Sequence, residues 1–187
     1  EDVGVQDHLH SAYGGFNKFS FFKDKIIRKT INITKTNLSA LENSMLLVHT
    51  GKKRAASSIA SEQIKKTKSK KINNSLYEIF KTVSEAEKLL TKFNENTTKE
   101  IGLLLHEYWM IKRSLTKKIS ADYLDEMYDK GLSMGAYGGK LCGAGGGGFF
   151  LFTLPLDAKE RFKRFFGEKN CIDFKVDFSG TKLIFKG

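Results

Sequence analysis

The alternation of apolar and polar positions predicts strands in the first quarter of the chain. Within 14–34, short runs of aromatic and β-branched residues lie on both sides of a turn at 23–25, which indicates two or three strands. Residues 45–48 form an apolar run that ends in His-Thr-Gly at 49–51. This pattern is typical of a buried strand followed by a loop.

Apolar residues at helical spacing predict three helices in the middle of the chain. The first runs through 76–93 and the second through 101–115. The third begins at Ser120, a suitable N-cap, and ends near Gly135.

The last third of the chain is dominated by glycine, since eight of the seventeen glycines lie within 135–148. This segment predicts a strand, a glycine loop and a second strand, the apolar run 149–152, which ends before the only proline, Pro155. A helix through 158–166 is expected next. Two closing strands are predicted after that helix, at 171–178 and 182–185.

The predicted fold class is α+β. From residue 45 onward the expected order is strand, several helices, two strands, helix and strand. This is the order of a ferredoxin-like split βαβ domain with inserted helices.

The net charge of +11 comes from two segments rather than from the whole surface. Residues 18–35 hold six basic residues and one acidic residue, and residues 52–71 hold eight and one. The lysines of 65–71 are interpreted either as a solvated linker between helices or as a nucleic-acid patch. We favour the linker, because no aromatic residues are interleaved to stack on bases.

Cysteine and histidine usage argues against a disulfide scaffold and a metal centre. Cys142 and Cys171 are the only cysteines, and neither has a zinc-site context, so we expect reduced thiols in a cytoplasmic protein. The histidines at 10, 49 and 106 are too scattered for a metal site and are expected to be structural, while Trp109 and Tyr108 are expected in the core.

Neither export nor membrane insertion is expected from this sequence. No apolar run reaches the roughly 18 to 20 residues of a membrane span, and the first residues do not resemble a signal peptide. The sequence starts without Met in what reads as a motif, so we expect a fragment.

Two motifs resemble the GHMP kinases, the family of galactokinase, homoserine kinase and mevalonate kinase. The glycine segment 139–148 is similar to the third conserved motif of that family, and Gly-Val-Gln-Asp-His at 4–8 resembles its Gly-x-x-Asp-Gln segment. Further likeness at 13–17, 50–57 and 106–113 points to the sugar-1-kinase branch that phosphorylates D-glycero-D-manno-heptose 7-phosphate.

The resemblance implies the C-terminal part of an ATP- and Mg²⁺-dependent kinase acting on O1 of a heptose 7-phosphate. It divides the chain into 1–40, a remnant of the N-terminal catalytic domain, and 41–187, the GHMP kinase C-terminal domain. The family holds nucleotide phosphates largely with a Pro-x-x-x-Gly-Leu-Gly-Ser-Ser motif, and no such string occurs here. Expected partners are therefore the sugar phosphate, ATP and the missing N-terminal half, and the chain alone should be inactive.

By resemblance, Asp7 is the catalytic base that accepts or orients the proton of the anomeric hydroxyl. Without the resemblance, Asp7 is an ordinary acid at a helix N-terminus. His8 replaces the family's Gln. Arg54 is expected either to bind a phosphate group or to belong to the basic linker.

The resemblance assigns further residues to two groups. The segment Tyr13, Gly14, Gly15 and Asn17 is expected to face the sugar, with a turn entering a strand as the alternative. The phosphate loop comprises Lys140, Gly143, Ala144, Gly145, Gly146 and Gly147, with a tight hairpin as the structural alternative.

Two alternative functions are considered in addition to the kinase. One is a basic ferredoxin-like module that binds RNA, which the continuous, burial-prone phenylalanine runs disfavour. The other is a catalytically silent GHMP-type partner subunit. For the protein in general, a homodimer is a further option, and no membrane partner is expected.

Overall fold

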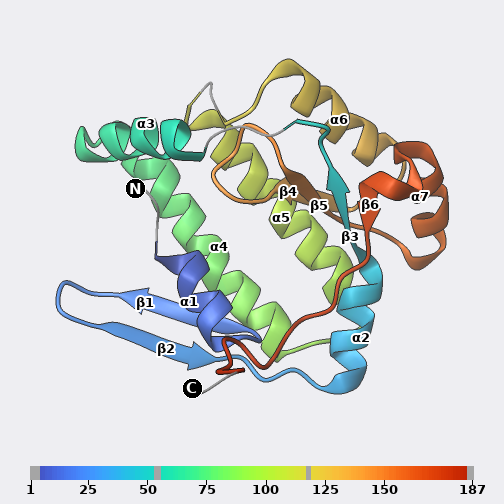
Figure 1. The fold of residues 1–187 in the computed structure, drawn as a ribbon, viewed down its shortest axis with the longest axis horizontal. Coiled ribbons are helices and arrows are strands. Elements are labelled where there is room, and N and C mark those ends of the chain that lie inside the picture. Colours follow the sequence, from blue (N-terminus) through green and yellow to red (C-terminus); the bar gives the residue numbers. More distant parts are fainter. Residues whose placement is uncertain (1–4, 53–55, 117–118, 185–187) are drawn as a thin grey trace.

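The computed structural model describes residues 5–52, 56–116 and 119–184. It begins with helix α1 (Gln6–Tyr13) and an antiparallel ribbon of β1 (Asn17–Phe21) and β2 (Ile26–Thr30). The ribbon and α1 lie beside α4 (Asn73–Thr91), whereas the main sheet lies beyond α5 (Thr97–Ser114) (Figure 1). The turn predicted at 23–25 connects β1 and β2, so this region contains two strands.

The main sheet has four antiparallel strands in the order β4-β5-β3-β6. They are β3 (Met45–His49), β4 (Gly138–Leu141), β5 (Phe149–Thr153) and β6 (Cys171–Ile172). The order of elements along the chain is the predicted one: strand, helices, two strands, helix, strand.

The prediction of long closing strands was wrong. Strand β6 spans only two residues, and the described residues beyond it form no strand. The backbone N–H of Val176 donates to the side chain of Glu42, and the carbonyl of Asp177 accepts from the N–H of Gly15. These backbone groups bond outside the main sheet, so the segment does not extend it. Residue 185 lies outside the described residues.

The predicted helices at 76–93, 101–115, 120–135 and 158–166 are confirmed in type. They correspond to α4, α5, α6 (Asp122–Ser133) and, after a 3-10 turn at Leu156–Ala158, α7 (Lys159–Phe166). Two further helices, α2 (Lys35–Ser44) and α3 (Ala56–Lys68), and a 3-10 turn at Glu168–Asn170 were not predicted. The proposed cap was also wrong, since Ala121 is the N-cap of α6 and Ser120 donates its hydroxyl to Asp125 instead.

The lysine-rich segment is only partly a linker. Residues 65–68 form the last turn of α3, because lysine is a good helix former and neither Gly nor Pro interrupts the segment. Lys66 donates to the carbonyl of Leu115 at 2.8 Å, which ties α3 to the end of α5. Lys70 and Lys71 lie in the turn before α4, and Lys70 has a positive φ of 60°.

The two faces of the main sheet pack against different sets of helices, and α5 contributes residues to both. Phe150 and Phe152 of β5 lie opposite Val48 and Leu46, and this face is covered by Trp109 together with residues of α6 and α7. The other face packs against α2 and the first turns of α5. Trp109 is fully buried, as predicted. The buried phenylalanines of the sheet are not available to stack on bases, which argues against the RNA-binding module.

Helix α5 approaches strand β4 through glycine. A side chain on Gly138 would overlap the carbonyl of Gly102, so only a glycine pair allows this distance. The close packing brings the last turns of α5 to the end of β4, where the glycine loop begins.

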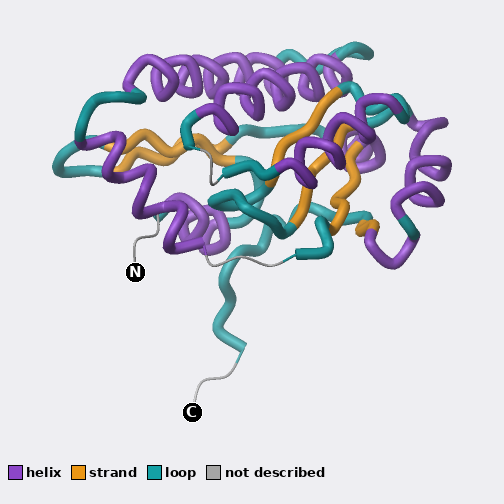
Figure 2. The backbone as a smooth tube through the Cα atoms, turned by 90° about the horizontal axis from the view of Figure 1, so that it is seen from above, coloured by secondary structure: helices purple, strands orange, loops and turns teal. Residues whose placement is uncertain are grey.

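The view of Figure 2 shows the last described residues extending away from the body. Leu183 and Ile184 are accordingly 80% and 95% exposed. Within the described residues, none of the helices combines the length and apolar character that a membrane crossing requires.

Candidate active site

A cavity of about 500 Å³ lies between the N-terminal elements and the helices α4 and α5. Lys140 of β4 and Tyr108 of α5 lie on its wall, and Gln6 of α1 contributes as well. The remaining lining residues are His10, Phe16, Asn17, Lys18, Phe19, Phe21, Thr82, Val83, Ala86, Leu104 and Leu105. The cavity therefore joins the start of the chain to the strand that leads into the glycine loop.

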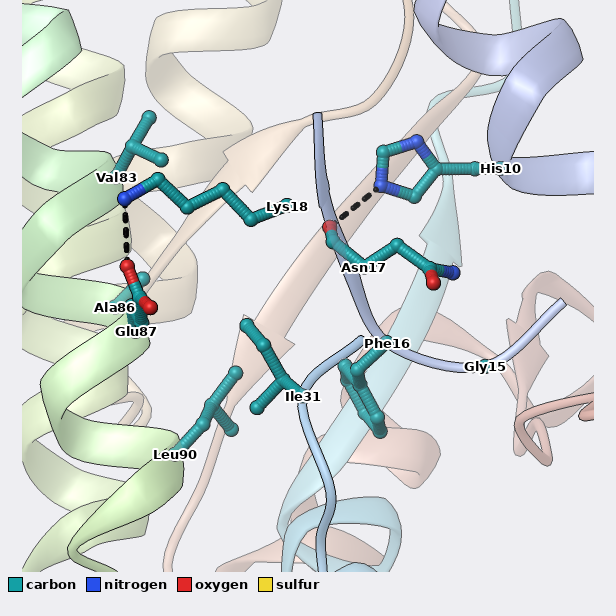
Figure 3. A pocket seen from close by; sticks show the side chains of 10 residues that line it. All are labelled: His10, Gly15, Phe16, Asn17, Lys18, Ile31, Val83, Ala86, Glu87 and Leu90. Carbon is teal, nitrogen blue, oxygen red and sulfur yellow. Dashed lines mark hydrogen bonds and ion pairs between the residues drawn. The ribbon is translucent and has the colours of Figure 1, made fainter. Parts of the chain in front are cut away.

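A second cavity of about 170 Å³ shares much of its wall with the first, including His10, Asn17 and Lys18 (Figure 3). Phe16, Ile31 and Leu90 form an apolar part of its wall. The two cavities adjoin, because both are lined by the polar residues His10, Asn17 and Lys18 as well as by apolar residues.

Glu87 of α4 anchors the β1–β2 ribbon at this position. Its carboxylate accepts a 2.6 Å hydrogen bond from Lys18 and a second from Lys29. These two ammonium groups, Lys18 first, lower the pKa of Glu87 from its usual 4.5 to about 2. The carboxylate is therefore ionised at neutral pH and ties both strands to the helix.

Asp7 lies in the first turn of α1 and is exposed. Its neighbour Gln6 lines the larger cavity. Burial raises the pKa of the Tyr108 phenol and of the Cys142 thiol, and the negative charge of Asp7 makes a smaller contribution in the same direction. The carboxylate therefore lies within electrostatic reach of the end of β4.

The glycine loop between β4 and β5 is held by its own backbone. The N–H of Gly146 donates to the carbonyl of Ile119, and the N–H of Gly148 donates to Thr50. Side chains on Gly145 or Gly147 would meet the backbone of Ile119 or Lys52. Close backbone approach thus accounts for these two glycines.

Gly143 differs from Gly145 and Gly147. It has a positive φ of 72°, and an added side chain there would meet nothing within 4 Å. Its carbonyl accepts a 2.6 Å hydrogen bond from the ammonium group of Lys112 on α5. The beginning of the loop is therefore open in space and tied to α5.

Lys112 is a residue that sequence reasoning missed. Only 8% of it is exposed, and burial first and the charge of Lys140 second lower its pKa from 10.5 to about 8. A signal did exist: Lys112 follows Tyr108 by four residues and Trp109 by three, so it lies on the buried face of the helix.

The expectation that Tyr108 belongs to the core was only partly met. It is half-buried, and its ring lies on the wall of the cavity. The ammonium groups of Lys140 and Lys112 lie 5.0 and 5.7 Å from the ring centre. Burial raises the pKa of the phenol, which keeps it neutral.

Of the four residues predicted to face the sugar, two line a cavity and two do not. Asn17 lines both cavities, and Gly15 lines the smaller one. Tyr13 lies outside both linings, with its ring 4.2 Å from the guanidinium of Arg28. Gly14 faces the backbone of Gly180, which leaves no space for a side chain. For Tyr13 and Gly14 the geometry is that of a turn packed against the C-terminal segment.

The remaining predicted residues are placed as follows. Arg54 lies outside the described residues. Nδ1 of His106 shares a 2.9 Å hydrogen bond with the hydroxyl of Tyr128, and His10 bonds to backbone carbonyls of Gln6 and Asn17. In the described part of the chain, no three His, Cys, Asp or Glu side chains are grouped so as to hold a metal ion.

Comparison with known proteins identifies a domain within the chain. Residues 86–173 match the family described as GHMP kinases C terminal. This match includes all of α5, the glycine loop and strands β4 and β5.

Similar proteins share most of the chain. It is 29% identical over 188 residues to the D-glycero-alpha-D-manno-heptose 7-phosphate kinase of Campylobacter jejuni subsp. jejuni, covering 97% of this chain and 54% of that protein. The chain thus spans about half the length of this relative.

Two solved structures share the fold. One is a D-glycero-D-manno-heptose 1-phosphate kinase from Bacteriodes thetaiotaomicron, with a TM-score of 0.65 and 22% identity over 93% of this chain and 46% of that chain. The other is the L. major mevalonate kinase in complex with R-mevalonate, with a TM-score of 0.67 and 18% identity over 90% and 51% of the two chains.

Proposed function

Because residues 86–173 form a GHMP kinase C-terminal domain, we propose that the chain is the C-terminal portion of a sugar-phosphate kinase. The proposed reaction transfers the γ-phosphoryl group of ATP to O1 of a heptose 7-phosphate, for nucleotide-sugar biosynthesis. The choice of sugar is supported by the likeness to the Campylobacter jejuni protein over 97% of this chain. The proposed partner is an N-terminal portion of the same kinase, equivalent to the part of the Campylobacter jejuni protein that this chain does not span.

One observation supports the proposal: helix α1, which carries Asp7, and the strand leading into the glycine loop border the same cavity. Gln6, next to Asp7, and Lys140, near the end of β4, are both on the wall of the larger cavity. The charge of Asp7 acts on the phenol of Tyr108 and the thiol of Cys142. The carboxylate of Asp7 thus belongs to an element that borders the space lined by the cationic Lys140.

This arrangement suits phosphoryl transfer, which requires mainly positioning and charge stabilisation. In the proposed mechanism, the oxygen of the anomeric hydroxyl attacks the γ-phosphorus of ATP, and Asp7 accepts the proton of that hydroxyl. Lys140 faces the negative charge of the phosphoryl oxygens. Asn17 lines both cavities, and its side-chain amide, which donates one hydrogen bond to the carbonyl of Gly14, has a second N–H for a sugar hydroxyl.

The described residues fit the phosphates of ATP better than they fit Mg²⁺. Lys140 supplies a positive charge, and the open surroundings of Gly143 allow a ligand to approach the backbone. Bound ATP would supply the phosphoryl group. For Mg²⁺, Asp7 would supply one carboxylate ligand. The further oxygen ligands that Mg²⁺ requires would come from the nucleotide and from the proposed partner portion.

The proposed domains, 1–40 and 41–187, would meet at the cavity. Helix α1 and strand β1 belong to the first domain, while α4, α5 and β4 belong to the second. Ligand sites commonly lie at domain interfaces. Residue 40 lies within α2, so the two parts would be joined by a continuous helix.

A phosphoryl-transfer assay on the full-length kinase tests the proposed substrate. The enzyme is incubated with ATP, Mg²⁺ and D-glycero-D-manno-heptose 7-phosphate, and the products are followed by ³¹P NMR. We expect a sugar 1,7-bisphosphate and ADP in equal amounts. Mannose 6-phosphate and mevalonate serve as competing acceptors, and a preference for either of them would contradict the proposed substrate.

A further inference from the structure

Two lysines from different elements converge beside the ring of Tyr108. Lys112 comes from α5, and Lys140 comes from β4. Their ammonium groups lie 5.7 and 5.0 Å from the ring centre. Lys140 lies on the wall of the larger cavity, whereas Lys112 lies behind it and donates to the carbonyl of Gly143.

Neither ammonium group has an acidic partner in the described part of the chain, where no carboxylate lies within 4.0 Å of either one. Other clustered lysines differ in this respect. Lys18 and Lys29 share Glu87, and Lys163 binds Asp173. A pair of lysines without counter-charges, one of them 8% exposed, is costly unless an anion compensates it.

We propose that Lys112 and Lys140 form a binding site for a phosphate group at the Tyr108 end of the larger cavity. Lys140 contacts the anion directly. Lys112 is a positioning residue, which holds the beginning of the glycine loop through Gly143 and adds positive potential from behind the wall. The site stands on its own geometry, and only the identity of the phosphate, from the nucleotide or from the sugar, rests on the proposed function.

The charges around Lys112 explain why an anion should be favoured there. Lys140 repels the charged form of Lys112, and an anion bound to Lys140 would offset that repulsion. Tyr108 and Cys142 stay neutral near pH 8, because burial raises the pKa of each. Asp7 is the opposing negative charge, and its exposure to solvent weakens its effect.

By linkage, an anion that prefers charged Lys112 must raise the pKa of this lysine. Sulfate is a suitable probe, because it keeps its charge between pH 7 and pH 11, whereas phosphate titrates near 7. The experiment records ¹³Cε-lysine NMR titrations of the 187-residue chain with and without saturating sulfate. We expect a lysine signal with a midpoint near pH 8, well below the usual 10.5, that moves upward with sulfate.

Two variants and one matched control assign the effect. In Lys112→Met the signal near pH 8 is lost, and sulfate affinity falls on the order of tenfold. In Lys140→Met the Lys112 midpoint rises in the free protein, because the repelling charge is gone, and sulfate no longer moves it. Lys99→Met removes an exposed lysine of the same helix and should change neither quantity.

Titrations with ADP and with mannose 6-phosphate then separate the two sources. If ADP moves the titration midpoint of Lys112 at the lower concentration, the site binds a nucleotide phosphate. If mannose 6-phosphate does so, the site binds a sugar phosphate. A midpoint near pH 8 that stays unmoved by sulfate, ADP and mannose 6-phosphate would overturn the proposal. Because these titrations involve no turnover, that failure is distinct from an absence of kinase activity in the full-length enzyme.

Discussion

The buried carboxylate of Glu42 accepts a 2.8 Å hydrogen bond from the backbone N–H of Val176. Lys175 donates to the other oxygen of the same carboxylate, and this bond, followed by that of Val176, lowers the pKa of Glu42. One side chain of α2 thereby holds the segment that follows β6. That segment in turn contacts the turn at Gly14 and Gly15, between α1 and β1.

Replacing Glu42 should loosen the C-terminal segment. Glu42→Ala leaves the N–H of Val176 without its acceptor, which typically costs about 1–3 kcal/mol. Urea denaturation of the variant measures the loss, and Glu95→Ala, an exposed acid in the turn before α5, serves as the control. Equal unfolding midpoints for Glu42→Ala and the unmodified chain would contradict this role.

Attachment of the β1–β2 ribbon should weaken at low pH. The folded pKa of Glu87 is about 2, below its usual 4.5, so the folded state holds this proton less tightly than the unfolded chain does. The stabilisation is therefore fully present above about pH 4.5 and is lost as the pH falls toward 2. The protection factors of the β1 and β2 amides, which are corrected for the intrinsic pH dependence of hydrogen exchange, should fall as the pH is lowered through this window. In Glu87→Gln this fall should be absent, and a similar pH response of the protection factors in both proteins would argue against the carboxylate as the anchor.

Lys112 should make the fold more stable at alkaline pH. Its folded pKa of about 8 lies below the usual 10.5, so the unfolded chain binds more protons between these values and stability rises with pH. The full difference amounts to at most about 3 kcal/mol. The measurement compares urea denaturation of the unmodified chain and Lys112→Met at pH 7 and pH 10.5. Identical pH dependence in the two proteins would show that Lys112 is not held in a buried, charged state.

The contact between α5 and β4 should tolerate no side chain at Gly138. In Gly138→Ala the added methyl group would overlap the carbonyl of Gly102 and lie 2.8 Å from Cβ of His106. We expect a loss of about 1–3 kcal/mol in the free energy of unfolding, because the helix must move away from the strand. Denaturant titration followed by Trp109 fluorescence measures it, since this indole belongs to the same helix and is fully buried. Unchanged stability would mean that the helix and strand are less closely packed.

Much of the fold could be predicted from local pattern. The strands around Leu46 and Phe150 and the helices around Ile79 and Leu104 follow from apolar runs and helical spacing, which report burial directly. The short length of β6 could not be predicted. The backbone N–H of Val176 bonds to the carboxylate of Glu42 instead of to a neighbouring strand, and Glu42 lies more than a hundred positions away in the sequence. Helix α3 was missed because its lysines were interpreted as a solvated linker.

Residues of the candidate site could be predicted only where they belong to a recognisable sequence motif. Asp7 and Lys140 were singled out by resemblance, and the structure puts Lys140 on the cavity wall and Asp7 within electrostatic reach of it. Lys112 was missed, because a lysine on an apolar helix face gives no indication of which carbonyl it will meet. Conversely, Gly14 was assigned to the sugar, whereas it accommodates the backbone of Gly180. Close backbone approach and ligand binding leave the same glycine signature in a sequence.

The central claim is that Asp7 acts on a substrate held in the cavity that Lys140 lines. The most direct measurement is the turnover number and the ATP affinity of Asp7→Asn in the full-length kinase, with Asp24→Asn, an exposed acid of the β1–β2 turn, as the control. The account predicts that Asp7→Asn lowers the turnover number by about 10²–10⁴-fold while the dissociation constant of ATP stays within a few-fold. A turnover number equal to that of Asp24→Asn would contradict it.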